Sequence, residues 1–380
     1  MNTTRSLLVG VVLLCLHSTL AFAQVTPRDL QSPFAGKRAI LDGDIPLWTE
    51  KEYVDRALAR IKEAGFNVYM PTVWQGRGTA WPSKYAPWDT KLADRSKVNF
   101  DPLRYLIQKA HELGIEVHPW FTLTLRQSDL FPDFALSGMP QKAFDIHNPR
   151  FRELMLRLVE EVVTDYDVDG INLDYVRAVG LCTSVTCQEE YHKNYQRDLE
   201  RDSLLFKVLP GSVPSLKEYQ ETAVTNLVRT ISETVRVKKP HIPISADVFV
   251  GHAPLSQGQN SIFWLNNGLV DGTFRMDYSR RINIESMDAT RRELNNPNRQ
   301  GLLISNMSNP DELRAGEKPF ARDGKWLADT MSMISKRWPE TGIAVYFYKY
   351  LTDEQIDALK KETSQWRERS RQSSGHTPAK

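Results

Sequence analysis

The 380-residue sequence predicts an α/β fold, a single (β/α)8 barrel with long loops at its carboxyl-terminal face. Two observations lead to this fold class. About eight short runs rich in Val, Ile and aromatic residues alternate with amphipathic helical runs, a pattern typical of βα units around a parallel sheet. The connections after the second, third, fourth, fifth and seventh strands are long, whereas those that precede strands are short. Barrel enzymes place their sites on such long loops.

The predicted elements follow one another without a sign of a second domain. Strands are expected at 38–43, 67–74, 115–124, 168–177, 242–250, 269–278, 300–308 and 341–350. Helical patterns are expected at 49–65, 101–114, 149–166, 215–239, 284–296, 324–338 and 352–369. Eight units favour a closed barrel over an open, doubly wound sheet. No GxGxxG follows a strand, so the pattern does not indicate a dinucleotide site.

The amino terminus has the features of a secretory signal. Arg5 precedes an apolar run at 7–16, and small residues flank Phe22 in Ala21-Phe22-Ala23. We expect a signal peptide over 1–23, a leader over 24–36, the barrel over 37–369 and a disordered polar tail over 370–380. A membrane anchor is the alternative, but the apolar run is short. The protein is therefore predicted to be exported, either to the periplasm or out of the cell.

Charge and motifs exclude several classes of function. Lys and Arg number 49 against 47 Asp and Glu, which indicates neither a nucleic-acid partner nor an anionic membrane surface. HExxH, P-loop and GxSxG motifs do not occur. His118 could bind a metal, but no second histidine is placed to join it. We expect no cofactor and no metal, and the sequence does not predict the oligomeric state.

Two cysteines remain once the signal peptide is removed. Cys182 and Cys187 lie in LCTSVTCQ. In an exported protein, this spacing predicts a disulfide that closes a small loop. Free thiols are the alternative, and a metal site would need further ligands.

The stretch VDGINLDYVR (168–177) carries the leading catalytic candidate. Alternate side chains of a barrel strand point inward and outward. With Ile171 and Leu173 facing the helices, Asn172 and Asp174 face the barrel interior, and Asp174 lies at the strand's upper end. The alternative is that Asp174 caps the next loop or pairs with Arg177.

A second carboxylate is needed for hydrolysis by two acids. In FRMDYS, we expect Phe274 and Met276 to face outward, which turns Asp277 inward at the top of the sixth strand. Asp174 and Asp277 would then lie on the order of 5–10 Å apart, which suits glycoside hydrolysis. Asp247, followed by Val and Phe, is the reserve candidate and is expected to lie deeper. The alternative for Asp277 is an ion pair with Arg275.

Aromatic and polar residues at the same strand ends suit a sugar. Sugar rings stack on aromatic side chains, and their hydroxyl groups bond polar ones. A single Trp at such a position can equally belong to the core. The predicted substrate-binding residues are Trp74, Trp120, Tyr175, Tyr278 and Tyr346, together with Asp42, His118, Asn172, Arg177 and Asn306.

Two segments resemble a known family. DPLRYLIQKAHELGIEVHPWF and VDGINLDYVR are similar to signature segments of the secreted bacterial glycosyl-hydrolase-like family 10 proteins. These are related to the glycosidase domain of the poly-N-acetylglucosamine export machinery. The resemblance covers about 38–350. It implies a (β/α)8 barrel acting on polysaccharide, with Asp174 as the leading catalytic candidate and His118, Trp120, Tyr175 and Arg177 lining the cleft.

The resemblance does not extend to the true family 10 xylanases. Those carry an Asn-Glu pair after strand four and a Glu after strand seven. Here Asp174 occupies the first site and no acid lies near Asn306, so their mechanism is not carried over. The stretch FRMDYS shows a short similarity to barrels that use an aspartate there, such as α-galactosidase-type enzymes.

We therefore expect an exported glycoside hydrolase that cleaves a polysaccharide with two carboxylates. One alternative is a non-catalytic barrel that binds a glycan during polysaccharide export or assembly. Another is a lyase or transglycosidase that uses the same cleft. The sugar, the linkage, endo or exo action and the stereochemical outcome are not predicted.

Overall fold

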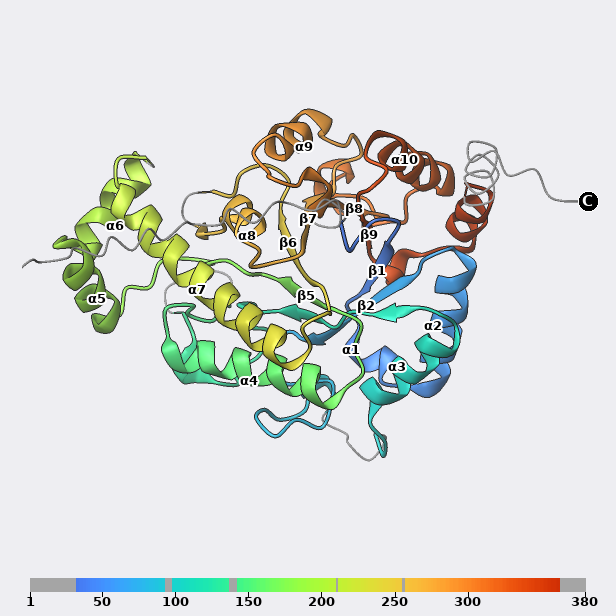
Figure 1. Cartoon of the computed structure of the whole chain (residues 1–380), viewed down its shortest axis with the longest axis horizontal. Coiled ribbons are helices and arrows are strands. Elements are labelled where there is room, and N and C mark those ends of the chain that lie inside the picture. Colours follow the sequence, from blue (N-terminus) through green and yellow to red (C-terminus); the bar gives the residue numbers. More distant parts are fainter. Residues whose placement is uncertain (1–31, 93–97, 137–141, 210, 255–256, 363–380) are drawn as a thin grey trace, which may run out of the picture.

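A computed structural model describes residues 32–92, 98–136, 142–209, 211–254 and 257–362. The predicted signal peptide, most of the leader and the predicted tail lie outside these residues. The described chain forms a closed parallel barrel surrounded by helices (Figure 1), which confirms the predicted fold class.

The barrel closes because its first strand pairs on both sides. β1 is hydrogen-bonded to β2 and to β9, and every pairing between neighbouring strands is parallel. The third barrel strand has two parts, β3 and β4, separated by His118 and Pro119. The strands are β1 (Arg38–Asp42), β2 (Val68–Trp74), β3 (Glu116–Val117), β4 (Trp120–Thr122), β5 (Ile171–Asp174), β6 (Ile244–Phe249), β7 (Gly272–Asp277), β8 (Gln300–Ser305) and β9 (Ile343–Tyr346).

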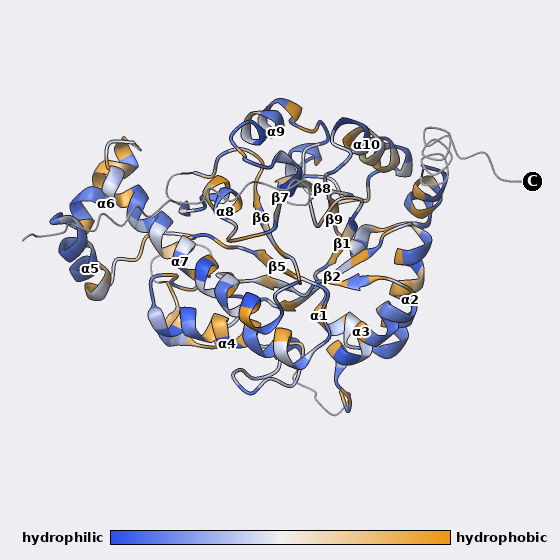
Figure 2. Ribbon diagram, in the orientation of Figure 1, coloured by the Kyte–Doolittle hydropathy of each residue, from blue (hydrophilic) through white to orange (hydrophobic). Residues whose placement is uncertain are grey.

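Several of the helices begin at a residue whose side chain accepts hydrogen bonds from the free backbone N–H groups of the first turn. Asp101 and Asn148 accept hydrogen bonds from the first turns of α3 and α4, and a proline follows each cap. In Figure 2 the helices carry both hydrophobic and hydrophilic residues, as amphipathic helices around a barrel should. The helices are α1 (Ile45–Trp48), α2 (Lys51–Glu63), α3 (Pro102–Glu112), α4 (Pro149–Asp165), α5 (Val185–Tyr195), α6 (Leu199–Val208), α7 (Pro214–Lys238), α8 (Ser261–Asn266), α9 (Ile284–Arg291) and α10 (Gly324–Arg337), and 353–362 is also helical.

Long connections follow the strands, as predicted. β2 ends at Trp74 and α3 begins at Pro102, while β5 ends at Asp174 and α7 begins at Pro214. The β5 connection contains α5 and α6, which project from the barrel on the left of Figure 1. These connections place many side chains around the carboxyl ends of the strands.

The amino end of the barrel is closed by Phe34. This side chain is almost fully buried and meets Phe274 edge to face, with ring centroids 5.4 Å apart. Gly272 leaves the space for it, because a Cβ atom there would lie 2.4 Å from the Phe34 ring. The end of the predicted leader is therefore part of the barrel's packing.

The predicted facing of the sixth barrel strand, β7, is wrong. Phe274 packs inside the barrel with Leu41 and Met70, and Met276 lies against the same cluster. Arg275 faces outward and donates hydrogen bonds to the carbonyls of Phe249 and Gly251. The sequence was compatible with either orientation of Phe274 and Met276, because apolar side chains fill the interior of such barrels as well as the layer beneath the helices.

The described part of the chain has no helix with the length and hydropathy of a membrane span.

Asp42 is a buried carboxylate on the outer side of the barrel wall. It accepts hydrogen bonds from the Tyr53 and Tyr69 hydroxyls, at 3.0 and 2.7 Å, and from the backbone N–H of Asp44. Tyr53 belongs to α2, so Asp42 joins the strand to a helix and does not face the predicted cleft. Burial raises the pKa of Asp42 to about 6.

We predict that Asp42 makes the protein less stable as pH rises from about 4 to 6. A folded-state pKa above the unfolded value means that the folded protein binds the proton more tightly, so stability falls as the proton is lost. The difference in unfolding free energy between wild type and Asp42→Asn should change by about 3 kcal/mol over this range. Urea denaturation at several pH values measures it, and a pH-independent difference would contradict the prediction.

Candidate functional site

Asp174 occupies the carboxyl end of β5, as the alternation of its strand predicts. Its Oδ2 atom accepts a hydrogen bond from Trp120 Nε1 at 3.2 Å, and its Oδ1 atom accepts one from the Tyr175 backbone N–H at 2.6 Å. The side chain is 6% exposed. Burial raises the pKa of Asp174, and the positive charge of Arg177 opposes that rise.

Asp247 lies beside Asp174 on the neighbouring strand. β5 and β6 pair Asn172 with Ser245 and Leu173 with Ala246, so the same register continued by one residue sets Asp174 opposite Asp247. Neighbouring strands lie about 5 Å apart. Asp247 is fully buried, and burial together with the Asp174 carboxylate raises its pKa well above the usual range.

Asn172 connects this pair to the layer below. Its Nδ2 atom donates to Asp247 Oδ1 at 3.1 Å and to Ser245 Oγ at 3.0 Å. Asp247 Oδ2 has no hydrogen-bond partner among the described residues. A buried carboxylate with one free oxygen beside a second carboxylate favours a single shared proton. Of the two carboxyls, Asp247 has the stronger tendency to keep that proton, since burial and the Asp174 carboxylate both raise its pKa.

Aromatic rings surround the carboxylates. Tyr278 and Tyr346 stack with centroids 5.4 Å apart, and Trp120 meets Tyr346 nearly at right angles with centroids 6.3 Å apart. Burial and the negative charges of Asp174 and Asp247 raise the pKa of Tyr278 well above its usual range. Burial also raises the pKa of Tyr346, to about 12. Both phenols therefore remain hydrogen-bond donors at neutral pH.

Arg177 and two more rings form the rim. Its guanidinium lies 4.3 Å from the centroid of the Tyr175 ring and 5.0 Å from that of Phe249. Tyr175 has a φ of 48°, in the left-handed region, because the chain turns directly after Asp174. Phe249 was not predicted for the site. It lies two residues beyond Asp247 on the same face of β6, so the alternation of that strand could have indicated it.

The structure places Asp277 away from this group. Its strand faces the opposite way from the one expected, and its carboxylate accepts hydrogen bonds from the backbone N–H groups of Ser279 and Asn283 and from the Ser279 hydroxyl. Asp277 thus organises the connection that leads to α9. It makes no ion pair with Arg275 either, since that side chain bonds backbone carbonyls.

Four predicted substrate-binding residues also lie elsewhere, namely Asp42, Trp74, Asn306 and His118. Asp42 is on the outer side of the wall, as described above. Trp74 is fully buried and stacks on Phe144 beneath the loops. Asn306 is fully buried and bonds Gln355 and the Phe347 backbone.

His118 lies near the amino end of the barrel. It is fully buried, its ring is 6.2 Å from that of Phe34, and its Nε2 atom is 3.3 Å from Glu116 Oε2. A Cβ atom on Gly170 would lie 2.6 Å from the His118 ring, which explains the glycine in VDGINLDYVR. The motif histidine therefore packs below the carboxylates and does not line the predicted cleft.

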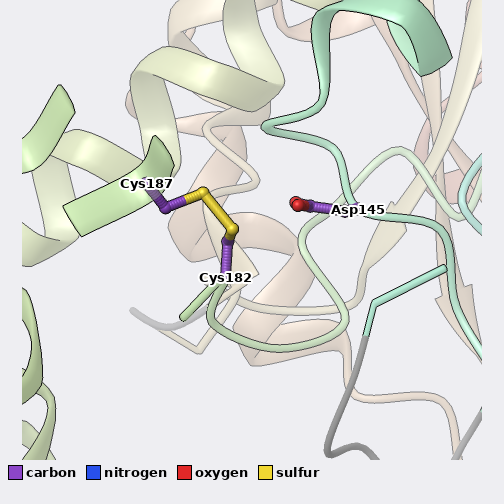
Figure 3. A group of neighbouring side chains, drawn as sticks. All are labelled: Asp145, Cys182 and Cys187. Atoms are coloured by element: carbon purple, nitrogen blue, oxygen red, sulfur yellow. A yellow bond between two sulfur atoms is a disulfide. The ribbon is translucent and has the colours of Figure 1, made fainter. Parts of the chain in front are cut away.

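The predicted disulfide between Cys182 and Cys187 is confirmed, with a Cα–Cα distance of 6.1 Å. The Asp145 carboxylate lies next to it (Figure 3), and these three side chains have the types and spacing of metal ligands. Both sulfur atoms are committed to the disulfide, however, and metal ions require thiolates. The disulfide fixes the start of α5, because Cys187 lies in its first turn.

The model of the family described as "Glycosyl hydrolase-like 10" matches residues 40–134 and 135–288. The chain belongs to this family. The matched residues include Asp174, Asp247 and Tyr278, whereas Tyr346 lies beyond the match. Membership confirms the resemblance that the two sequence segments carry.

Two similar proteins are named as glycosyl hydrolases. The chain is 22% identical over 217 residues to glycosyl hydrolase YngK of Bacillus subtilis, covering 53% of this chain and 40% of that protein. It is 20% identical over 254 residues to glycosyl hydrolase DigH of Escherichia coli K12, covering 56% of this chain and 55% of that protein. The chain thus spans about half or less of the length of these relatives.

Solved structures support the fold. The glycoside hydrolase domain of PgaB (BpsB) from Bordetella bronchiseptica has a TM-score of 0.63 and 11% identity, covering 85% of this chain and 98% of that one. The α-L-fucosidase isoenzyme 2 from Paenibacillus thiaminolyticus has a TM-score of 0.60 and 15% identity, covering 88% and 50%. At these identities the similarity concerns the fold alone.

We predict that replacing both cysteines with serine lowers the unfolding free energy by about 2 kcal/mol, the value expected for a disulfide that closes a short loop. Thermal and urea denaturation of Cys182→Ser/Cys187→Ser measure this loss. Wild-type protein treated with a reductant should match the variant. An unchanged transition in both samples would contradict a stabilising role for the bond.

Proposed function

We propose that this chain hydrolyses O-glycosidic bonds of a polysaccharide, with Asp174 and Asp247 as the carboxylate pair. The observation that carries the proposal is their placement, side by side and facing inward at the carboxyl end of the barrel. A pair that shares one proton offers one protonated and one ionised carboxyl. Two-carboxylate glycosidases need both forms. Membership of the glycosyl hydrolase-like family supports the same reaction class.

Asp174 is the member assigned to contact the substrate. It is the more exposed of the two, and its hydrogen bonds from Trp120 and Tyr175 favour the ionised form. Asp247 lies deeper and holds the proton. It passes this proton to Asp174, which donates it to the glycosidic oxygen as the bond between that oxygen and the anomeric carbon breaks. Water adds to the anomeric carbon, and the proton that this water loses returns to the carboxylate pair. The aromatic rings of Trp120, Tyr278 and Tyr346 supply stacking faces for a sugar ring.

We predict that Asp174→Asn and Asp247→Asn each lower kcat by at least 100-fold, since each removes one half of the acid and base chemistry. Release of reducing ends from a panel of bacterial exopolysaccharides and chitooligosaccharides measures this. Asp277→Asn is the matched control, because Asp277 lies on the outer face and bonds only its own loop. Loss of activity in Asp277→Asn with retention in Asp247→Asn would restore the pair first expected from the sequence.

The second candidate is a barrel that binds a glycan without cutting it. The full burial of Asp247 favours it, because only one carboxyl of the pair reaches the surface. Isothermal titration with the same glycans distinguishes the two functions. Mass spectrometry of the glycans after incubation shows whether any bond has been cut or any new linkage formed. Binding by wild type, with no release of reducing ends and no new linkage, would favour the binding function over hydrolysis, lyase and transglycosidase action.

We also propose that the protein is exported to the periplasm or beyond. The signal-like residues 1–23 support this, and so does the Cys182–Cys187 disulfide, since such bonds persist in oxidising compartments. Fractionation of cells that express the full sequence tests it. Mature protein that begins near Gln24 in the exported fraction is expected, and full-length protein confined to the cytoplasm would contradict it.

A further inference from the structure

The ladder between β5 and β6 ends just below the two carboxylates. The last paired residues are Leu173 and Ala246, one position before Asp174 and Asp247. Beyond this point β5 turns away, as the positive φ of Tyr175 shows. Strand pairing alone therefore does not hold the two carboxylates at a fixed separation.

Gln259 bonds both chains at this level. It lies in the connection between β6 and α8, and its side chain is 7% exposed. Its Nε2 atom donates to the carbonyls of Val176 and Asp247, both at 3.4 Å, and its Oε1 atom accepts from the Phe249 backbone N–H at 2.9 Å. One side chain thus connects the backbone that follows Asp174 to the backbone that carries Asp247.

The loop that presents Gln259 is itself held in place. Gly258 has a φ of 64°, and a Cβ atom there would lie 2.5 Å from the Gln220 carbonyl oxygen, so the backbone approaches α7 as closely as glycine allows. The Ala178 backbone N–H donates to the Gln257 carbonyl at 2.8 Å. The two residues that precede Gln259 are therefore held in place, Gly258 against α7 and Gln257 against the chain that follows β5.

We infer that Gln259 is a positioning residue that sets the separation of Asp174 and Asp247. The inference rests on the proposed function for its catalytic consequence, though not for its geometry. A fixed separation determines how strongly the two carboxyls repel each other and which of them keeps the proton. It also keeps Asp174 aligned with the substrate, and a misplacement of about 1 Å costs on the order of 100-fold in rate. The sequence has no motif that indicates this residue.

The test compares Gln259→Met with wild type. Methionine keeps the length and approximate volume of glutamine but makes none of the three hydrogen bonds. We expect kcat to fall by 10- to 100-fold with little change in KM, because the substrate-contacting rings are untouched. We also expect the Asp247 carboxyl to titrate at lower pH as the pair moves apart. Carbon-13 NMR of aspartate-labelled protein, assigned with Asp174→Asn and Asp247→Asn, follows that titration without a substrate.

Gln300→Met is the matched control. Gln300 is also fully buried and bonds the backbone of Met287, but it lies at the amino end of β8. The Gln300→Met protein should be less stable than wild type, and its Asp174 and Asp247 titrations should be unchanged. If Gln259→Met fails to fold, Gln259→Leu replaces it, since leucine is also uncharged and makes none of the three hydrogen bonds. Either variant should then shift the Asp247 titration.

The outcomes separate this inference from the proposed function. Unchanged kcat and carboxyl titrations in the folded Gln259 variants would overturn the positioning role while hydrolysis stands. A wild type that cleaves none of the glycans, yet shows the shifted Asp247 titration in the variant, would overturn the proposed function and support the positioning role. Equal shifts in the Gln259 and Gln300 variants would reduce Gln259 to a structural residue.

Discussion

The structure depends on how two carboxyl groups are kept side by side inside a barrel. Asp174 and Asp247 face inward from neighbouring strands, where full ionisation of both would be costly because little water reaches them. The protein tolerates the pair by giving Asp174 two hydrogen-bond donors and Asp247 one, and by placing Arg177 near the first. What remains is a pair with a raised affinity for a proton. That property links the fold to the proposed chemistry.

The surroundings of the pair follow from the same constraint. A water-poor site strengthens electrostatic interactions, and aromatic rings keep water out while they remain able to bind a sugar ring. Tyr278 and Tyr346 keep their phenolic protons, since their pKa values rise in this environment. Backbone and side-chain bonds from Asn172 and Gln259 hold the acids from below and from the side. The site is thus a small number of inward-facing residues fixed by buried polar contacts.

Much of this could be predicted from the sequence, and the failures have physical reasons. The alternation in VDGINLDYVR gave the right direction for Asp174 because the strand alternates two apolar residues, Ile171 and Leu173, with the polar Asn172 and Asp174. FRMDYS was ambiguous, since both the interior and the outer layer of a barrel accept Phe and Met. The prediction placed Phe274 and Met276 on the outer face, and it therefore placed Asp277 wrongly in the interior. Asp247 was ranked lower because the residues after it suggested depth, whereas depth is what raises its affinity for a proton. His118 and Trp74 were expected in the cleft because position along a strand does not reveal how the amino end and the loops are packed.

The most direct test of the central claim is a crystal structure of Asp174→Asn bound to an oligosaccharide that the wild type cleaves or binds. We predict a sugar ring packed against Trp120, Tyr278 and Tyr346, with a glycosidic oxygen within hydrogen-bond distance of residue 174 and Asp247 directly beneath it. A glycan bound outside the carboxyl end of the barrel, or one whose glycosidic oxygen lies nearest Asp277, would contradict the assignment of Asp174 and Asp247 as the working pair.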